Sequence, residues 1–270
     1  MPTDRKAIFI TGAASGIGLA TAKRFAAEGW LVGLSDIDAP GLKAALAAIG
    51  GDNSGFTVLH DVRKEDEWER ALDAFMEASG GRLDVLVNNA GIARYGWFTD
   101  QGRNDFDDQI DINLRGVILG AYLGHERLKH TSGSRLINIA SLASLSGSPR
   151  LAVYCATKFA VRGLSEALDI EFMRSGVKVC CVEPTVIETP LLDKASKPDG
   201  PSFRDAITQG MGGGLPVEQA AEVIWRAAHD DALHYPVGEA PAALLQEILP
   251  RVEETRERWR GMFSAGLVTD

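Results

Sequence analysis

The sequence predicts an α/β fold in one domain: a parallel sheet of about seven strands with helices on both faces. Short, continuously apolar runs alternate with longer amphipathic ones, which is typical of strands buried on both faces and of the helices that cover them. The 270 residues, 45% of them hydrophobic and 24% charged, are those of an ordinary globular chain with a sizeable core. We therefore expect a single large domain.

Seven apolar runs have the length and composition of strands, and the last of them is the weakest. They are residues 7–11, 31–35, 56–60, 83–89, 134–140, 177–183 and 234–237. Of the helical patterns between them, the clearest runs from Val217 to Ala228 with apolar residues at i, i+3, i+4 and i+7. Residues 105–129 and 153–174 each predict one long helix.

Two segments interrupt this alternation. Residues 184–215 are rich in Pro, Gly, Lys and Asp, and so long a loop in a compact domain is often a lid over a binding site. A plain surface insertion has the same composition and stays open as an alternative. Residues 239–270 predict a C-terminal helical extension of two pieces that meet at Pro250.

Charge and cysteine usage argue against several classes of protein. Acids outnumber bases by 37 to 28, a net charge of −9, which argues against a nucleic-acid or anionic membrane surface. The three cysteines form no disulfide framework, and the five histidines lack metal-ligand spacing, so we expect no metal. No apolar leader or run of about 18 apolar residues is present, so we expect a cytoplasmic protein.

Three glycines follow the first strand, in "TGAASGIG" at residues 11–18. Gly12, Gly16 and Gly18 would let the backbone turn tightly and approach a pyrophosphate, with the helix N-terminus supplying N–H donors. The spacing G-x-x-x-G-x-G differs from the usual G-x-G-x-x-G, but its place between strand and helix is the expected one. It indicates a doubly wound, Rossmann-type dinucleotide-binding sheet.

Asp36 ends the second strand, eighteen residues after Gly18. An acid at this place accepts hydrogen bonds from the adenosine ribose and repels the additional phosphate of NADP. Positions 15 and 37 hold Ser and Ile, so no base there would offset the repulsion. The cofactor predicted is NAD, although Asp36 would also fit as a plain loop acid.

The stretch "SLASLSGSPRLAVYCATK" holds a hydroxyl, a phenol and an amine. Tyr154 and Lys158 are four residues apart and share one helix face, and Ser141 precedes Tyr154 by thirteen residues. A nearby ammonium lowers the pKa of a phenol, so Tyr154 is a candidate acid/base group. A buried ring beside a solvated amine is the plainer interpretation of the same spacing.

Seven features follow one another along the chain: "TGAASGIG", Asp36, "HDV" (60–62), "NNAG" (88–91), Asn113, Ser141 and "YCATK" (154–158). Together they resemble the short-chain dehydrogenase/reductase family. The resemblance is to its compact single-domain subclass and covers about residues 5–238. It implies a dinucleotide-binding and catalytic domain over 1–238, including the 184–215 lid, and a homo-oligomer, tetramer or dimer, with interfaces near 105–129 and 153–174.

The resemblance also implies roles for single residues. Tyr154 would be the general acid/base, Lys158 would lower its pKa and bind the nicotinamide ribose, Ser141 would hold the substrate oxygen, and Asn113 would support a proton relay. The implied cofactor-binding residues are Gly12, Ser15, Gly16, Ile17, Gly18, Asp36, Ile37, Asp61, Val62, Asn89, Ala90, Gly91, Tyr154, Lys158, Pro184, Thr185, Ile187 and Thr189. Thr185 stands where the family usually has glycine.

An apolar set near the motifs suggests a hydrophobic or aromatic secondary alcohol, or its ketone, as substrate. Its members are Ile92, Tyr95, Trp97, Leu142, Leu145, Leu191, Leu192 and Met211, and the substrate contacts expected are Ala143, Tyr95, Leu191 and Leu192. Arg94 and Arg150 stay candidates for an anionic substrate group.

The function expected is NAD-dependent hydride transfer between the nicotinamide and this small-molecule alcohol. Three alternatives stay open: an NADP-dependent carbonyl reductase, a non-catalytic NAD(H)-binding regulator, and a sugar-nucleotide epimerase of the larger subclass. The last needs a substantial C-terminal substrate domain, and only about thirty residues follow Gly238.

Overall fold

The computed structural model describes residues 5–193, 202–210 and 213–264. Seven strands form one parallel sheet in the order β3-β2-β1-β4-β5-β6-β7. They are β1 (Ala7–Thr11), β2 (Leu31–Asp36), β3 (Gly55–Leu59), β4 (Val85–Asn88), β5 (Arg135–Ile139), β6 (Lys178–Pro184) and β7 (His234–Val237). The predicted α/β sheet of about seven strands is confirmed, and each observed strand overlaps its predicted run.

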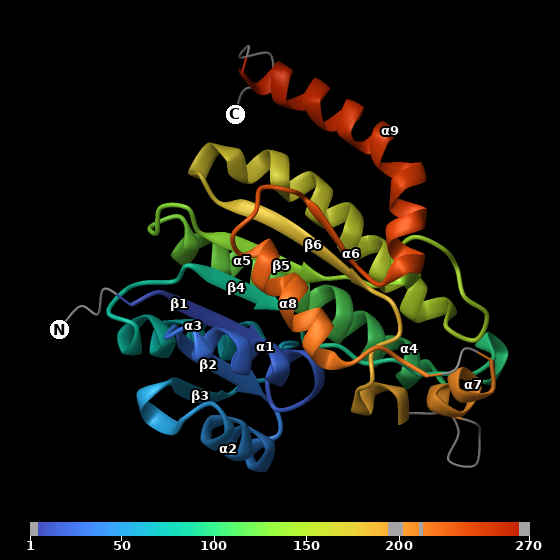
Figure 1. The fold of residues 1–270 in the computed structure, drawn as a ribbon, viewed down its shortest axis with the longest axis horizontal. Coiled ribbons are helices and arrows are strands. Elements are labelled where there is room, and N and C mark those ends of the chain that lie inside the picture. The colour runs from blue at the N-terminus through green and yellow to red at the C-terminus, as the bar shows by residue number, and fades with distance from the viewer. Residues whose placement is uncertain (1–4, 194–201, 211–212, 265–270) are drawn as a thin grey trace.

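Helices cover both faces of this sheet, as Figure 1 shows. One layer contains α1 (Gly16–Ala27), α2 (Ala39–Ala48) and α8 (Val217–Ala227), and its core is built around residues such as Phe25, Leu34 and Ile224. The other contains α3 (Glu65–Ala78), α5 (Gly116–Leu128) and α6 (Ala152–Glu171), with Trp68, Phe75 and Leu86 in its core. The central strands are apolar on both faces because both faces are buried.

The long helix expected over 105–129 is interrupted. It consists of α4 (Arg103–Ile110), a π-helical turn at Asp111–Arg115, and α5. Single π-helical turns within helices are frequent at functional sites, and this one carries Asn113. The helix expected over 153–174 is α6, followed by a 3₁₀ turn at Phe172–Ser175.

Within the described residues, the expected lid contains a 3₁₀ turn at Pro190–Asp193 and the short helix α7 (Phe203–Gly210). The C-terminal segment differs from the prediction, since Glu239–Ser264 is one helix, α9, with Pro250 inside it. The helix bends between its two ends in Figure 1, as a proline inside a helix requires.

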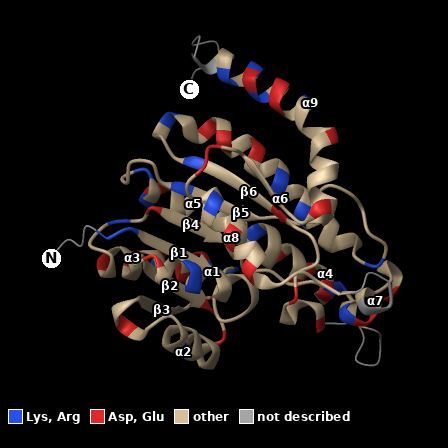
Figure 2. Ribbon diagram, viewed as in Figure 1, with Lys and Arg blue, Asp and Glu red and all other residues tan. Residues whose placement is uncertain are grey.

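Ion pairs fix the C-terminal half of α9 to α6. Arg256 Nε donates to Asp169 Oδ2 of α6 at 2.6 Å, and Arg260 Nη2 reaches the same oxygen at 3.3 Å. Figure 2 shows the basic and acidic residues that alternate along this part of α9. A domain boundary at Gly238 stays a prediction.

Candidate active site

A pocket of about 740 Å³ lies at the carboxyl ends of the strands. Its walls come from the segments after β1, β4, β5 and β6, and the strand order reverses between β1 and β4. In open parallel sheets, ligands bind at this switch point. The pocket contains every predicted cofactor, catalytic and substrate residue except Gly18 and Asn113, which lie behind its wall.

The glycine turn is built so that a ligand can approach the backbone. Gly12 and Gly16 have φ values of +66° and +54°, which side-chain-bearing residues rarely adopt. A Cβ on Gly18 would lie 2.3 Å from the carbonyl oxygen of Gly12, so no side chain fits there. Asn89 Nδ2 donates to Thr11 O at 2.8 Å and to Gly12 O at 3.2 Å, and so ties the turn to the end of β4. A dinucleotide would fit this cradle, and the N–H groups at the start of α1 would hold its pyrophosphate.

Two backbone N–H groups hold the Asp36 carboxylate in place. Its Oδ2 accepts from Ala14 N and its Oδ1 from Asp38 N, both at 3.1 Å.

One base that the sequence analysis overlooked, Arg63, lines this part of the pocket. Arg63 is paired with Asp61 at 2.7 Å, and this pair holds the pKa of the Asp61 carboxyl below its usual range. Its guanidinium therefore already has an anionic partner.

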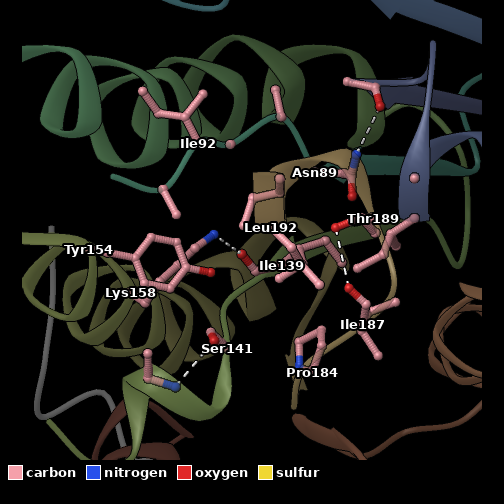
Figure 3. A pocket seen from close by; sticks show the side chains of 18 of the residues that line it. Asn89, Ile92, Ile139, Ser141, Tyr154, Lys158, Pro184, Ile187, Thr189 and Leu192 are labelled. Carbon is pink, nitrogen blue, oxygen red and sulfur yellow. Dashed lines mark hydrogen bonds between the residues drawn. The ribbon is translucent and has the colours of Figure 1, made fainter. Parts of the chain in front are cut away.

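Tyr154, Lys158 and Ser141 meet in the middle of the pocket (Figure 3). The first two project from the start of α6, one turn apart, and Ser141 follows β5. Ser141 Oγ accepts from Ala143 N at 3.1 Å and caps the turn Leu142–Ser144, so its own O–H stays available to donate. Lys158 Nζ donates to Ile139 O at 2.8 Å and lies 5.7 Å from the centroid of the Tyr154 ring.

Burial controls the ionisation of this group. It raises the pKa of Tyr154 to about 12, and the hydrogen bond with Ser141 opposes that rise. It lowers the pKa of Lys158 to about 8. Lys158 is directed to the carbonyl of Ile139, and desolvation is the largest effect on the phenol. The lowering of the Tyr154 pKa by Lys158 stays a prediction. Tyr154 is therefore a neutral proton donor at neutral pH.

We expect Lys158→Met to stabilise the fold at pH 7 by about 2 kcal/mol. The drop in the pKa of Lys158 from 10.5 to about 8 means that the buried ammonium destabilises the fold at pH 7 by about 3 kcal/mol. Methionine removes this cost but also loses the hydrogen bond to Ile139 O, which contributes about 1 kcal/mol. Between pH 8 and pH 10.5 the unfolded lysine keeps a proton that the folded one has lost, so wild-type stability rises with pH. The variant's advantage should shrink over that range and reverse.

Urea unfolding across this pH range measures the effect, with Lys43→Met, an exposed lysine of α2, as the matched control. A constant difference between wild type and Lys158→Met would contradict the assigned cause.

Asn113 is fully buried in the π-helical turn and does not line the pocket. Its Oδ1 accepts from Ile92 N at 2.8 Å, its Nδ2 donates to Ile92 O at 2.8 Å, and Nδ2 also reaches Thr157 Oγ1 at 3.3 Å. It therefore fixes the segment after β4 against α6. The proton relay that the resemblance implies stays a prediction.

The pocket continues beyond Tyr154 into an apolar chamber. Ala93, Ala143 and Leu151 line it and form one buried cluster with Cys155, and Tyr95, Tyr154, Leu191 and Phe203 pack against this cluster. The four predicted substrate contacts all line the pocket. Of the wider apolar set, Trp97 and Leu145 do not line it, and Met211 lies outside the described residues.

Several pocket residues were missed by the sequence analysis. They include His60, Leu151, Phe203 and Ile207. Phe203 and Ile207 are apolar residues one helical turn apart, within the segment that the sequence predicts as a lid. This spacing indicates a short helix with an apolar face, and it could have identified both residues. Burial lowers the pKa of His60 to about 4, so it is neutral at physiological pH.

The two arginines considered for an anionic substrate group are engaged elsewhere. Arg94 lines the pocket, but its Nε donates to Asp105 Oδ1 at 3.2 Å. Arg150 is not in the wall, and its guanidinium carbon lies 4.6 Å from the centroid of the Trp97 ring. The geometry gives no support to recognition of an anion by either.

Thr185, which stands where the family usually has glycine, lines the pocket and also packs against Gly238. A Cβ on Gly238, whose φ is +101°, would lie 2.7 Å from Thr185 Cγ2, so the threonine methyl occupies the space that a side chain at 238 would need. Thr185 N also donates to Val237 O at 3.0 Å. The threonine is thus packed without closing the pocket.

Cys181, Glu183 and His234 offer ligand atoms within 4.8 Å of one another, all buried, behind the sheet end. His234 Nδ1 and Glu183 Oε1 are 2.6 Å apart, and Glu183 Oε2 accepts from Tyr235 N at 3.1 Å. These bonds join β6 to β7. The absence of a metal site stays a prediction. Within the described ranges, no helix has the length and apolar character to cross a membrane.

Both the sequence and the fold match known proteins. A family profile described as short chain dehydrogenase matches residues 6–200. The chain is 36% identical over 234 residues to D-threitol dehydrogenase of Mycolicibacterium smegmatis, covering 85% of this chain and 88% of that protein. It is 36% identical over 189 residues to 3-alpha-(or 20-beta)-hydroxysteroid dehydrogenase of Mycobacterium bovis, covering 70% and 71%.

Among solved structures, a short chain dehydrogenase/reductase from Burkholderia phymatum in complex with NAD superposes with a TM-score of 0.80. It is 25% identical, and the match covers 95% of this chain and 97% of that one.

Proposed function

The chain belongs to the short-chain dehydrogenase/reductase family, and on that premise we propose that it is an NAD-dependent oxidoreductase of secondary alcohols and their ketones. One observation carries the proposal. Tyr154, Ser141 and Lys158 converge at one part of the same pocket whose other part holds the glycine turn and Asp36. A substrate oxygen at the first would therefore be adjacent to a dinucleotide at the second.

A bound nicotinamide supplies the hydride acceptor or donor, and the chain supplies the proton and the geometry. In reduction, Tyr154 Oη gives its proton to the substrate oxygen, because burial keeps the phenol protonated at neutral pH. Ser141 Oγ donates to the same oxygen and fixes its position. In oxidation the proton moves the opposite way, and the Lys158 ammonium, one helical turn away, stabilises the phenolate.

The preference for NAD rests on Asp36, and the hydrophobic or aromatic substrate rests on the apolar chamber. The names of the relatives do not decide the substrate, since one acts on a polyol and the other on a steroid. The alternative, an NADP-dependent carbonyl reductase, has one observation in its favour, the arginine at position 63 in the adenosine part of the pocket.

We also expect a homo-oligomer, tetramer or dimer. Helices α5 and α6 carry exposed apolar side chains, such as Tyr122 at 68% and Phe159 at 43% exposure, and these favour the expected interfaces. The cytoplasmic location stays a prediction.

The test of the proposed function is turnover of a panel of secondary alcohols with NAD and, in parallel, with NADP. The panel spans aliphatic, aromatic, steroid and polyol alcohols, and absorbance of the reduced nicotinamide is the readout. We expect reduced cofactor with NAD and an aromatic or aliphatic alcohol. Measurable binding of NAD without turnover of any alcohol or ketone would favour a non-catalytic regulator instead.

A further inference from the structure

One aromatic pair closes the apolar chamber beside Tyr154. The rings of Tyr95 and Phe203 stack with centroids 5.2 Å apart and planes 24° from parallel. Tyr95 comes from the segment after β4, and Phe203 is the first residue of α7 in the lid. Two segments far apart in the sequence thus meet over the place where a substrate would extend from its reacting carbon.

The Tyr95 side of this pair is braced by the surrounding loop. Gln101, buried to 9% exposure, donates to Gly96 O at 2.8 Å and to Arg94 O at 3.2 Å. Arg150 Nη1 donates to the Tyr95 hydroxyl at 3.4 Å, and Arg150 O accepts from Gly96 N at 3.0 Å. Arg150 has a φ of +68°, a strained value for a residue with a side chain, which the contacts on both sides maintain.

The Phe203 side is anchored through its neighbour. Arg204 Nη2 donates to Thr189 O at 3.1 Å, and the same guanidinium is ion-paired with Glu188 and Asp193. Ile207, one turn further along α7, is 2% exposed and lines the pocket. The lid helix therefore rests on residues 188–193 and holds Phe203 over the chamber.

The chamber offers few polar partners to a substrate. Its walls are mainly apolar, and include Ala93, Ala143, Leu151, Leu191, Phe203 and Ile207, with the polar residue Ser148 near Leu151. Among the described residues beside it, the hydroxyls of Ser141 and Tyr154 are committed to the reacting oxygen. The Tyr95 hydroxyl oxygen accepts from Arg150 Nη1, so its O–H and the Ser148 hydroxyl are left for a second substrate hydroxyl. Each further hydroxyl of a polyol would lose its hydrogen bonds to water here, which costs about tenfold or more in affinity.

From this arrangement we propose that Tyr95 and Phe203 set the substrate class, an uncharged secondary alcohol or ketone whose carbinol carbon carries an apolar ring. The ring packs against the aromatic pair, which favours flat or cyclic groups over small aliphatic chains. This inference rests on the proposed function. It predicts poor turnover of polyols such as threitol, although one relative is named for that substrate.

The experiment compares Phe203→Leu with Phe98→Leu. Phe98 is the matched control because it also stacks on an aromatic ring, Phe106 at 5.1 Å and 10°, but is 57% exposed and lies outside the pocket. For each protein, kcat/KM is measured with 1-phenylethanol and with 2-butanol, and the KM for NAD is recorded. We expect Phe203→Leu to lose about tenfold with 1-phenylethanol and less than twofold with 2-butanol. Phe98→Leu should change neither.

Binding is measured separately, so that failure of the proposed function can be recognised. Acetophenone and NAD form a complex that cannot react, since the ketone and the oxidised cofactor are both electron acceptors. Calorimetric titration of acetophenone into the NAD-loaded protein should show about tenfold weaker binding in Phe203→Leu. If that difference appears while no alcohol turns over, the proposed reaction fails and the binding inference holds.

Three results would overturn the inference: equal losses for both alcohols in Phe203→Leu, unchanged acetophenone binding, or a wild-type preference for D-threitol over every ring alcohol. Tyr95→Leu is the second variant, which removes the other ring, and it should show the same selectivity. Thermal unfolding of all variants checks that the fold is retained.

Discussion

Tyr154→Phe is expected to lower kcat by about a thousandfold in both directions of the reaction, because it removes the one group placed to exchange a proton with the substrate oxygen. Phenylalanine keeps the ring that packs in the chamber base and removes only the hydroxyl. Binding of NAD should therefore change little, and the loss should appear in kcat more than in KM. Steady-state kinetics with the best alcohol and its ketone, together with calorimetric titration of NAD, measure both.

The matched control is Tyr235→Phe. Tyr235 is a buried tyrosine of β7 that does not line the pocket, so the same chemical change there should leave the kinetics as they are. If Tyr154→Phe kept more than a tenth of wild-type kcat, another group would be exchanging the proton, and the assignment of Tyr154 would be wrong.

The fold was predictable because its signal is local. A strand buried on both faces is apolar throughout, so runs such as 7–11 and 234–237 identify β1 and β7 with the observed bounds. Pro250 was less informative. A proline interrupts the hydrogen bonding of a helix, and two pieces were expected, but α9 continues through it, and Arg256 fixes its far half to Asp169. That contact is between distant segments and has no trace in local composition.

In the candidate site, too, some residues could be predicted from local patterns and others depend on tertiary contacts. The glycine turn, Asp36 and the Tyr154–Lys158 pair follow strand ends or share a helix turn, so their meeting at one edge of the sheet follows from topology. Trp97 and Phe203 show the limit. Both are aromatic and lie in segments that the sequence predicts as loops, yet Trp97 is 54% exposed and Phe203 begins α7 and faces Tyr95 in the pocket. The direction of a loop side chain depends on tertiary contacts that sequence patterns do not carry.

Asp36→Asn should reverse or abolish the preference for NAD over NADP, with a change of about a thousandfold in the ratio of the two kcat/KM values. The carboxylate would bind the ribose hydroxyls of NAD, and a hydrogen bond to a charged group contributes about 1.5–3 kcal/mol. It would also repel the extra phosphate of NADP by roughly 4 kcal/mol at 4 Å and an effective dielectric of 20, much of which solvent screens. Asparagine removes the charge and keeps the shape and the acceptor for Ala14 N.

Asp38→Asn is the matched control, because Asp38 is an exposed acid two residues away that caps α2 by accepting from Gly41 N at 3.1 Å, outside the pocket. It removes the same charge and should leave the ratio unchanged, which separates a local contact from the general field of the protein. Equilibrium binding of both dinucleotides by calorimetry makes the result independent of the alcohol used. If the wild type already preferred NADP, the assignment of Asp36 would be wrong. Arg63 would then bind the additional phosphate of NADP, for which its guanidinium would have to leave Asp61. In that case Arg63→Gln would remove the preference for NADP.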